Sequence, residues 1–453
     1  MKDRWIPDLD RVSGAKYLAI TDAISSAIES GDLRAGDRLP PQRDLAGRLG
    51  VDLTTVTKAY DQARNRGLIT ARGRAGSFIL PRDAIAAGPP PRDTGMNMPP
   101  EVNGGSLLAA WERTTSALLR AKGAGGRLHY VPAGGREADR IAGARIFARI
   151  GLACHPDQVV VTAGSQNALH AIVSTILQRG DTVACGAQVY PGFIALALKA
   201  GLRLVPMARV AAAELEALCR RETVAALYVV PTNDNPTTAT LEAAQRADLA
   251  EVVRRHGVVL IEDDAYGQLD ETPILPLSSL APELGWYIAT TSKTISPAIR
   301  VAHVHAPSLR QAMALAAEVH DSSVMAPPLN AALVTSWVED GNYDRLIAET
   351  RAEATRRQNI AADSLPRNSY AAHPCGYHLW VPLGPDSNAA QISAALAGAG
   401  ITAIPADSFM PCKSSVPAVR VSLGGPVEDM AIRRGLTMLA MHLSAGGQSP
   451  RLI

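Results

Sequence analysis

The chain carries, at residues 290–300, the stretch Thr290-Thr291-Ser292-Lys293-Thr294-Ile295-Ser296-Pro297-Ala298-Ile299-Arg300, directly after an apolar run, Trp286 to Ala289, that is typical of a buried strand. A lysine that forms a Schiff base with an aldehyde cofactor needs a short tether and a lowered pKa, and the cofactor's phosphate needs hydroxyl and guanidinium donors nearby. Thr290, Ser292 and Arg300 are candidate donors around Lys293. Most lysines beside serines are solvated surface residues, so the rest of the chain must decide between these interpretations.

Length and composition set the first limits. At 453 residues the chain is too long for one compact core, so two or three domains are expected. The net charge of +2 provides no overall field for nucleic acid or a membrane, so any such binding must be local. The five cysteines form no C-x-x-C pair, which favours reduced thiols, and no metal is expected. An acidic N-terminus and the lack of a long apolar run predict a cytoplasmic location.

Residues 10–80 have the pattern of a separate small module. Helices are predicted from Tyr17 to Ser30, from Pro40 to Gly50, and from Leu53 to about Gly67, with Asp52 as the N-cap of the third. Two short apolar runs, residues 68–71 and 77–80, flank a turn with two glycines and indicate a hairpin. Three helices and a hairpin in this order outline a winged helix-turn-helix.

The charge of this module is unlike that of the whole chain. Between Arg34 and Arg74 there are nine Lys or Arg residues against four Asp, an excess of five positive charges. A charge run is usually only a solvated face, but this one coincides with the elements that enter DNA grooves. DNA binding is therefore predicted for the start of the third helix and for the hairpin tip, with the candidate residues Thr54, Thr55, Thr57, Lys58, Arg72 and Arg74.

The residues themselves are also recognisable. The run Gly31-Asp32-Leu33-Arg34-Ala35-Gly36-Asp37-Arg38-Leu39-Pro40-Pro41-Gln42-Arg43-Asp44-Leu45-Ala46, followed by Leu49-Gly50-Val51, Thr55-Val56, Ala59-Tyr60 and Gly67-Leu68, resembles the GntR-type DNA-binding domain over about residues 14–80. That resemblance implies that Arg43, Thr54, Thr55, Thr57 and the wing glycine Gly76 lie at the DNA. Leu53 stands where many relatives have a guanine-reading arginine, which leaves the operator sequence open.

Residues 81–102 are rich in proline and lack a periodic apolar pattern, so they are predicted to form a semi-stiff linker. Its last residues, 97–100, can alternatively be an ordered loop on the large domain. After the linker, short β-branched apolar runs alternate with helical stretches, which predicts an α/β domain with a mostly parallel sheet and helices on both faces. The strands are expected at residues 158–162, 182–184, 202–205, 226–230, 258–261 and 286–289.

Polar motifs follow several of these strands, at the end where α/β sheets bind ligands. Ser165 and Gln166 open a helix whose free N–H groups suit a phosphate. Asn235 follows another strand, and Asp263 and Tyr266 follow a third. A carboxylate there can keep a pyridine nitrogen protonated, because opposite charges ~4 Å apart at an effective dielectric constant of ~20 attract by roughly 4 kcal/mol. Taken singly, these motifs are as well explained by a capped helix, a solvated acidic turn or a metal ligand.

In this order, the motifs resemble fold-type I pyridoxal-phosphate aminotransferases from about Asn97 to the C-terminus. The resemblance implies a PLP-binding large domain over residues 103–310 and a C-terminal helix with a small α/β subdomain over residues 311–453. Lys293 would form the internal aldimine and Asp263 would pair with the ring nitrogen. The other implied contacts are Asn235 and Tyr266 with the phenolic oxygen, Tyr190 with the ring face, Ser165, Gln166, Thr290, Ser292 and Arg300 with the phosphate, Tyr130 with the phosphate of a neighbouring subunit, and Arg420 with a substrate carboxylate.

The chain departs from the family pattern at glycines. The family's Asn-Pro-Thr-Gly is Asn235-Pro236-Thr237-Thr238 here, and its Pro-Gly-Leu-Arg-x-Gly-Tyr is Pro297-Ala298-Ile299-Arg300-Val301-Ala302-His303. Glycine lost near the cofactor narrows the freedom of the backbone and is expected to affect turnover more than binding. His303 and His305 alternate along a predicted strand and need no metal as buried or interface residues.

A GntR module joined by a proline-rich tether to an aminotransferase-like domain is similar to the MocR subfamily of bacterial transcriptional regulators. This resemblance implies a homodimeric, PLP-dependent transcription factor that binds operator DNA and senses an amino compound through aldimine exchange at Lys293. Two alternatives remain open at this point. One is a working aminotransferase that carries a DNA-binding module, since all the catalytic groups are present, and the other is a cofactor-free dimerisation scaffold.

Overall fold

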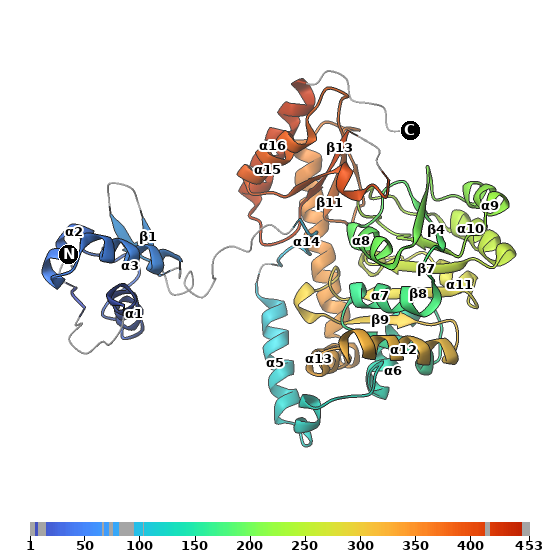
Figure 1. The fold of residues 1–453 in the computed structure, drawn as a ribbon, viewed down its shortest axis with the longest axis horizontal. Coiled ribbons are helices and arrows are strands. Elements are labelled where there is room, and N and C mark those ends of the chain that lie inside the picture. Colours follow the sequence, from blue (N-terminus) through green and yellow to red (C-terminus); the bar gives the residue numbers. More distant parts are fainter. Residues whose placement is uncertain are drawn as a thin grey trace. The chain divides into compact units, whose positions relative to one another are not determined.

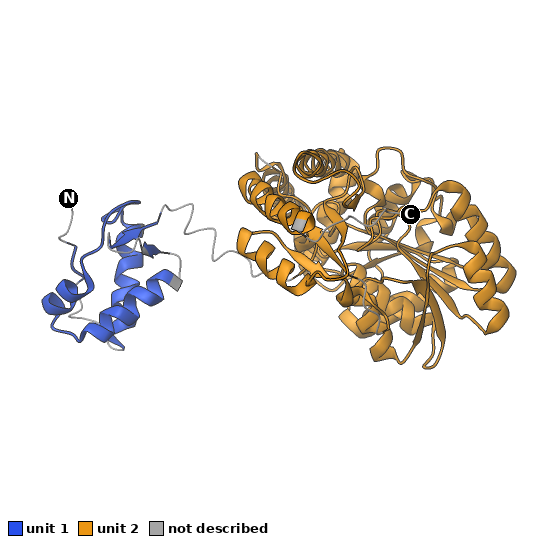
Figure 2. Ribbon diagram, turned by 90° about the horizontal axis from the view of Figure 1, so that it is seen from above, with its two compact units in different colours: residues 1–94 blue, residues 95–453 orange. Residues whose placement is uncertain are grey.

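The computed structural model describes residues 5–7, 15–65, 68–71, 76–80, 95–102, 104–412 and 417–445. The chain divides into two compact units, residues 1–94 and residues 95–453 (Figure 2). Among the described residues, every helix is too short or too polar to cross a membrane.

Within its described residues, unit 1 contains the three helices and the hairpin that the sequence predicts. They are α1 (Lys16–Glu29), α2 (Gln42–Leu49), α3 (Leu53–Asn65) and the antiparallel pair β1 (Ile69–Ala71) and β2 (Ser77–Ile79). Ile20 and Ile24 of α1 and Val56 and Tyr60 of α3 face inward and are buried together. Burying a large apolar side chain contributes about 1.5–3 kcal/mol, so these faces hold the helices against each other.

The turn between α2 and α3 has the geometry that its residues favour. Gly50 ends α2 with a left-handed φ of 59°, a conformation that glycine adopts without a steric penalty. Asp52 then accepts hydrogen bonds from the backbone N–H and the hydroxyl of Thr54, at 2.7 and 2.6 Å, and so caps the start of α3. Both signals are local, which is why the sequence located this turn.

Unit 2 is built on a seven-stranded sheet (Figure 1). Its strands are β3 (Val159–Thr162), β4 (Thr182–Gly186), β5 (Arg203–Met207), β6 (Ala226–Val229), β7 (Val259–Asp264), β8 (Gly285–Thr290) and β9 (Ala302–His305). The order across the sheet is β3-β9-β8-β7-β6-β4-β5, and β9 runs antiparallel to both of its neighbours while the pairs from β8 to β5 are parallel. The predicted mostly parallel sheet is therefore confirmed.

Both faces of this sheet are covered by helices, because alternate strand residues enter different cores. Val183 and Ile261 pack with α7 (Ser165–Ile176), α8 (Pro191–Ala200) and α12 (Leu309–Ser323). Ala184 and Leu260, one residue away on the same strands, pack with α9 (Ala212–Arg221), α10 (Ala243–His256) and α11 (Leu277–Leu280). Strands buried on both faces read as continuous apolar runs, which is how they appear in the sequence.

A second, antiparallel sheet has the order β10-β11-β13-β12. Its strands are β10 (Ala371–Ala372), β11 (His378–Pro382), β12 (Ala403–Pro405) and β13 (Ala418–Ser422), and it is covered by α15 (Ala389–Ala399) and α16 (Asp429–Ala445). The remaining described elements are α5 (Ser106–Arg120), α6 (Glu137–Ala148), α13 (Pro328–Asp340), α14 (Asn342–Ser364), and the 3-10 turns η2 (Ala124–Leu128), η3 (Pro156–Gln158), η4 (Gly267–Leu269), η5 (Pro297–Ile299) and η6 (Ala406–Phe409).

The end of the predicted linker belongs to unit 2. The backbone N–H of Gly425 donates to the Pro99 carbonyl at 3.0 Å, and the N–H of Glu101 donates to the Gly425 carbonyl at 3.3 Å. For residues 95–102 the linker prediction is therefore replaced by membership of unit 2, and for residues 81–94, which lie outside the described residues, it stays a prediction. A division of unit 2 at residue 310 stays a prediction, because one core joins Phe147, Tyr287 and Trp337 across that boundary.

Candidate cofactor site and DNA-binding surface

Lys293 lies just after β8, with its amine inside the protein. Its Nζ donates a hydrogen bond to the backbone carbonyl of Asn97 at 2.6 Å, and its own carbonyl accepts one from the Tyr377 hydroxyl at 2.9 Å. Burial, together with the nearby Arg420 and Arg300, lowers the pKa of Lys293 to about 8, although Asp263 acts in the opposite direction. A larger fraction of Lys293 is therefore uncharged at neutral pH than of an ordinary lysine, as a nucleophilic amine requires.

Two adjacent carboxylates on β7 point to opposite faces of the sheet. The Tyr228 hydroxyl donates to Asp263 Oδ2 at 2.9 Å, and the Tyr287 hydroxyl donates to Asp264 Oδ2 at 2.7 Å. Each tyrosine comes from the neighbouring strand, on the diagonal of the strand pairing. Side chains alternate along a strand, so only Asp263 shares a face with the Lys293 amine. The sequence predicted that the strand ends at Ile261, whereas it continues through both carboxylates.

One oxygen of Asp263 is left without a donor. Asp263 is 5% exposed, and its Oδ1 has no hydrogen-bond partner among the described residues. Burial raises the pKa of Asp263 to about 6, against the effect of the Tyr228 hydrogen bond. A buried carboxylate oxygen without a partner is unfavourable, and a protonated pyridine nitrogen would satisfy it. This orphaned oxygen fits the ring of pyridoxal phosphate.

The side-chain amides of Asn97 and Asn235 form hydrogen bonds at the end of the site that contains Tyr266 and Arg420. Asn97 Nδ2 donates to the Tyr266 hydroxyl at 3.0 Å, and Asn97 Oδ1 accepts from the Ser422 hydroxyl at 2.7 Å. Asn235 Oδ1 accepts from Arg420 Nη1 at 3.1 Å. Tyr266, Asn235 and Arg420 are all buried, so three predicted site residues from three distant parts of the chain are gathered here.

The other end of the site collects donors for an anion. Ser165 is the first residue of α7, and the Arg300 guanidinium donates to the Ala163 carbonyl just before that helix, at 3.0 Å. The hydroxyls of Thr290 and Ser292 lie 2.9 Å apart at the end of β8. Thr290 pairs with Ala302, which also pairs with the last residue of β3, so the helix start and the hydroxyls meet at one edge of the sheet. Helix N–H groups, hydroxyls and a guanidinium are the groups that bind phosphate.

Glycines allow close approaches in this part of the site. A Cβ atom on Gly164, which has φ of 87°, would lie 3.0 Å from the Arg300 guanidinium carbon. A Cβ atom on Gly192 would lie 2.4 Å from the Tyr190 ring and 2.5 Å from Gln166 Oε1, an oxygen that is buried and unpaired among the described residues. Burial raises the pKa of Tyr190 and Asp263 raises it further, which places Tyr190 beside that carboxylate. The donor set as a whole therefore fits pyridoxal phosphate.

Thr238 stands where the family has glycine, and its backbone keeps a conformation that suits glycine. Its φ is 63°, and the side chain is buried. A β-branched residue in this region of φ is strained. Ala298 and Ala302 replace two further glycines of the family pattern without positive φ values among the described residues. Of the three replacements, only Thr238 occupies a backbone conformation that favours glycine.

Five residues that sequence reasoning did not assign to the site contact it: Asn97, Tyr228, Tyr377, His378 and Ser422. Tyr228 had a signal, because it is the single hydroxyl-bearing residue in an apolar strand. Asn97 had none, since it lies in a proline-rich stretch and meets Tyr266 only through tertiary structure. Tyr130 is 83% exposed and does not join the other predicted cofactor-site residues within this chain.

The proposed DNA surface is only partly described. Arg43, Thr54 and Lys58 are exposed on α2 and α3, while Thr55 and Thr57 are half-buried. The Thr57 hydroxyl donates to Gln42 Oε1 at 2.9 Å, so it also joins the two helices. Gly76 has φ of 105°, and a Cβ there would lie 2.9 Å from Arg38 Nε. Arg72 and Arg74 lie outside the described residues.

Comparison with known proteins agrees with this division of the chain. The family model for bacterial regulatory proteins of the gntR family matches residues 16–79, and the family model for aminotransferase class I and II matches residues 101–433. The second match, with the donor set above, gives pyridoxal phosphate as the cofactor of unit 2.

Two regulators and one aminotransferase illustrate what the chain is similar to. The HTH-type transcriptional regulator YdeF of Bacillus subtilis is 26% identical over 455 residues, which cover 96% of each chain. The vitamin B6 salvage pathway transcriptional repressor PtsJ of Salmonella typhimurium is 28% identical, and the aligned region covers 85% of this chain and 90% of PtsJ. The crystal structure of the alpha-aminoadipate aminotransferase LysN from Thermus thermophilus, complexed with N-(5'-phosphopyridoxyl)-L-leucine, has the same fold, with a TM-score of 0.68 at 24% identity over 78% of this chain and 93% of LysN.

Both family matches occur on one chain, with the GntR match preceding the aminotransferase match. The GntR match carries the DNA-binding function, and the larger match carries the cofactor. The chain therefore belongs to the aminotransferase class I and II family and, through the GntR domain that precedes that region, to the MocR subfamily of GntR-type transcriptional regulators.

Proposed function

We propose that this DNA-binding regulator senses an amino compound through Lys293. The observation that carries the proposal is the environment of Lys293, a half-buried lysine whose pKa is lowered to about 8 by removal of its amine from water and by Arg420. A solvated lysine has a much smaller uncharged fraction at neutral pH and would react more slowly with an aldehyde. The same chain carries a GntR domain, which a purely metabolic enzyme would not need.

Pyridoxal phosphate, when bound, supplies an aldehyde carbon that bonds reversibly to amines, so that Lys293 and an incoming amine compete for it. The protein's own residues hold that group in place. Asp263 keeps a proton at the ring nitrogen, and Tyr190 covers the ring. The remaining proposed contacts are Asn235 and Tyr266 for the phenolic oxygen and Ser165, Gln166, Thr290, Ser292 and Arg300 for the phosphate.

The site has a direct connection to the start of unit 2. Lys293 Nζ donates to the carbonyl of Asn97 at 2.6 Å, and Arg420 Nη2 donates to the carbonyl of Gly95 at 2.7 Å. Gly95 is the first residue of unit 2, and the chain leads from it towards the DNA-binding unit. An amino acid would engage both groups, its amine displacing Lys293 and its carboxylate competing for Arg420. Ligand binding would thus release residues 95–97, and a coupling of about 1–3 kcal/mol is typical of such a device.

Two further parts of the proposal concern the assembly and its location. The exposed Tyr130 ring is proposed to reach the phosphate site of a second copy, which makes the working form a homodimer. The protein is proposed to act in the cytoplasm, where its DNA, its cofactor and free amino acids meet.

Replacing Arg420 tests the sensing site. We expect Arg420→Ala to weaken binding of an amino acid by about 30- to 1000-fold, because a buried guanidinium–carboxylate pair is lost at a truncation penalty of roughly 2–4 kcal/mol. The measurement is the absorbance of the bound cofactor during titration with single amino acids. Arg434→Ala is the matched control, because that guanidinium donates to the Ala399 carbonyl in the smaller subdomain.

An amine with the same skeleton but no carboxylate should bind wild-type protein and Arg420→Ala equally well. Equal loss for both ligands would refute a carboxylate role for Arg420. A keto-acid exchange assay separates the regulator from the working aminotransferase. Fast turnover would favour the enzyme, whereas an absorbance change without turnover supports the sensor. A colourless protein that takes up no pyridoxal phosphate would favour the scaffold.

Replacing Arg43 tests the DNA surface. We expect Arg43→Ala to weaken binding to a DNA fragment from upstream of the gene by roughly 1–3 kcal/mol if the side chain reads a base. Fluorescence anisotropy at several salt concentrations measures this, and affinity should fall steeply with salt. Arg48→Ala is the control on the same helix, since Arg48 forms an ion pair with Asp44 at 3.1 Å. Unchanged affinity of Arg43→Ala, or a flat salt response, would contradict the proposed surface.

A further inference from the structure

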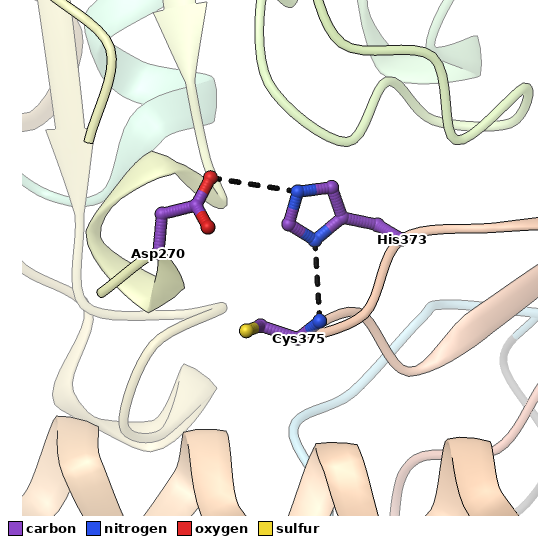
Figure 3. A group of neighbouring side chains, drawn as sticks. All are labelled: Asp270, His373 and Cys375. Carbon is purple, nitrogen blue, oxygen red and sulfur yellow. Dashed lines mark hydrogen bonds and ion pairs between the residues drawn. The ribbon is translucent and has the colours of Figure 1, made fainter. Parts of the chain in front are cut away.

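Three side chains with metal-binding atoms converge beside the cofactor site (Figure 3). Asp270 directly follows η4, while His373 and Cys375 lie in the loop between β10 and β11. His373 Nε2 lies 3.4 Å from Asp270 Oδ2, and one ligand atom from each of the three residues lies within 4.8 Å of the others. All three are half-buried, so an ion could reach them from solvent.

We propose that Asp270, His373 and Cys375 form a binding site for a divalent transition metal ion, with Zn²⁺ as the best match. A carboxylate, an imidazole and a thiolate are all zinc ligands, and three protein ligands leave a fourth position for water. Tetrahedral zinc places its ligand atoms about 3.3–3.7 Å apart, given bond lengths of about 2.0–2.3 Å. The Asp270–His373 pair already has this spacing, and the Cys375 sulfur lies within 4.8 Å of a ligand atom of each of the other two residues.

The backbone around the cluster is already fixed. Arg351 donates to the Leu269 carbonyl and, through Nη2, to the Asp270 carbonyl at 3.1 Å. On the other segment, the Thr355 hydroxyl donates to the Pro374 carbonyl at 3.3 Å. Ligands that are held before the ion arrives lose less conformational freedom on binding. These contacts come from α14, which packs against both segments.

Protons must move when the ion binds. The N–H of Cys375 donates to His373 Nδ1 at 3.3 Å, so the imidazole proton lies on Nε2 and points to Asp270. Coordination through Nε2 transfers that proton to Nδ1 and gives up this long hydrogen bond. Cys375 binds as the thiolate and releases one proton to solvent. Burial raises the pKa of the Cys375 thiol, and Asp270 raises it further, so the proton is still present at neutral pH.

An ion bound to Asp270, His373 and Cys375 would affect the cofactor site, because the two segments that hold these ligands lead into it. Asp270 follows Tyr266 after only the short turn η4, and Cys375 precedes Tyr377, whose hydroxyl donates to the Lys293 carbonyl at 2.9 Å. Gly376 lies against Asn233, where an added Cβ would be 2.7 Å from the Asn233 amide nitrogen. A metal ion would therefore join two segments that each continue into the cofactor site.

The test is a Zn²⁺ titration of the reduced, full-length, cofactor-loaded protein against a chromophoric chelator. We expect one Zn²⁺ per chain, and binding about 100-fold weaker or more in Cys375→Ser, His373→Asn and Asp270→Asn, since even the loss of an outer-shell partner weakens sites by about 10- to 100-fold. Cys154→Ser is the matched control, because Cys154 is a half-buried cysteine that packs against the core of unit 2. Circular dichroism of each variant without metal shows whether it folds.

Two further readouts identify the ligands. Co²⁺ in place of Zn²⁺ should produce a thiolate-to-metal absorption band that is lost in Cys375→Ser and kept in Cys154→Ser. Apparent affinity should rise about tenfold per pH unit below the thiol pKa, because one proton is released. No stoichiometric binding, or binding that all three folded variants retain, would overturn the proposal and leave Asp270 and His373 as a hydrogen-bonded pair only.

Discussion

Lys293→Ala is expected to abolish covalent retention of the cofactor completely. Among the described residues, Lys293 is the lysine that sequence and structure place in this site, and its pKa is lowered to about 8. Borohydride reduction of the wild-type protein, followed by peptide mapping, should place the label on the peptide that contains Lys293. The variant should carry no label and lose the visible absorbance of the bound cofactor.

The control for this prediction is Lys199→Ala, on the exposed side of α8, which should be labelled like the wild-type protein. Folding of Lys293→Ala is expected to be preserved, because the side chain makes a single hydrogen bond among the described residues, to the Asn97 carbonyl. A label on another lysine, or none in the wild-type protein, would remove the basis of the proposed sensing mechanism.

Asp263→Asn is expected to weaken cofactor binding by about 100- to 1000-fold. Asparagine cannot hold the proton at the ring nitrogen, and the lost attraction is roughly 4 kcal/mol at ~4 Å and an effective dielectric constant of ~20. The measurement is the dissociation constant of pyridoxal phosphate for the apoprotein, from absorbance or fluorescence. The neighbouring Asp264→Asn is a matched control, since that side chain lies on the other face of β7 and binds Tyr287 and the Gly267 N–H.

The same pair of variants predicts a pH dependence. Burial raises the pKa of Asp263 to about 6 from its ordinary value, so the carboxylate of the apoprotein becomes protonated as pH falls through 6. A protonated Asp263 cannot pair with a protonated ring nitrogen, so cofactor affinity should fall below pH 6 in wild type and in Asp264→Asn. In Asp263→Asn the loss of affinity below pH 6 should be smaller, because the Asp263 carboxylate no longer contributes to it. Equal losses of cofactor affinity in Asp263→Asn and Asp264→Asn would show that the buried charge controls affinity, and that pairing of Asp263 with the ring nitrogen does not.

Local sequence patterns predicted much of the fold. The turn between α2 and α3 is specified by Gly50 and Asp52, which act on their immediate neighbours. The strands of the large sheet were visible as β-branched runs, although β7 extends three residues beyond the predicted end, because Glu262 and Asp264 are satisfied by hydrogen bonds that no local pattern reveals. Lys293 stood out because its neighbours are hydroxyl residues.

The sequence by itself determined the two modules and their order, because helix periodicity, strand runs and caps depend on residues close together in the chain. It also pointed to Lys293 as the candidate reactive lysine and to the kind of donors that a cofactor would meet. Tertiary structure alone decided which groups meet. Asn97 reaches Tyr266, Tyr228 reaches Asp263, and Asp270 reaches His373 only because strand register and helix packing bring distant segments together. Contacts of this kind depend on the position of the whole backbone, which no short stretch of sequence specifies.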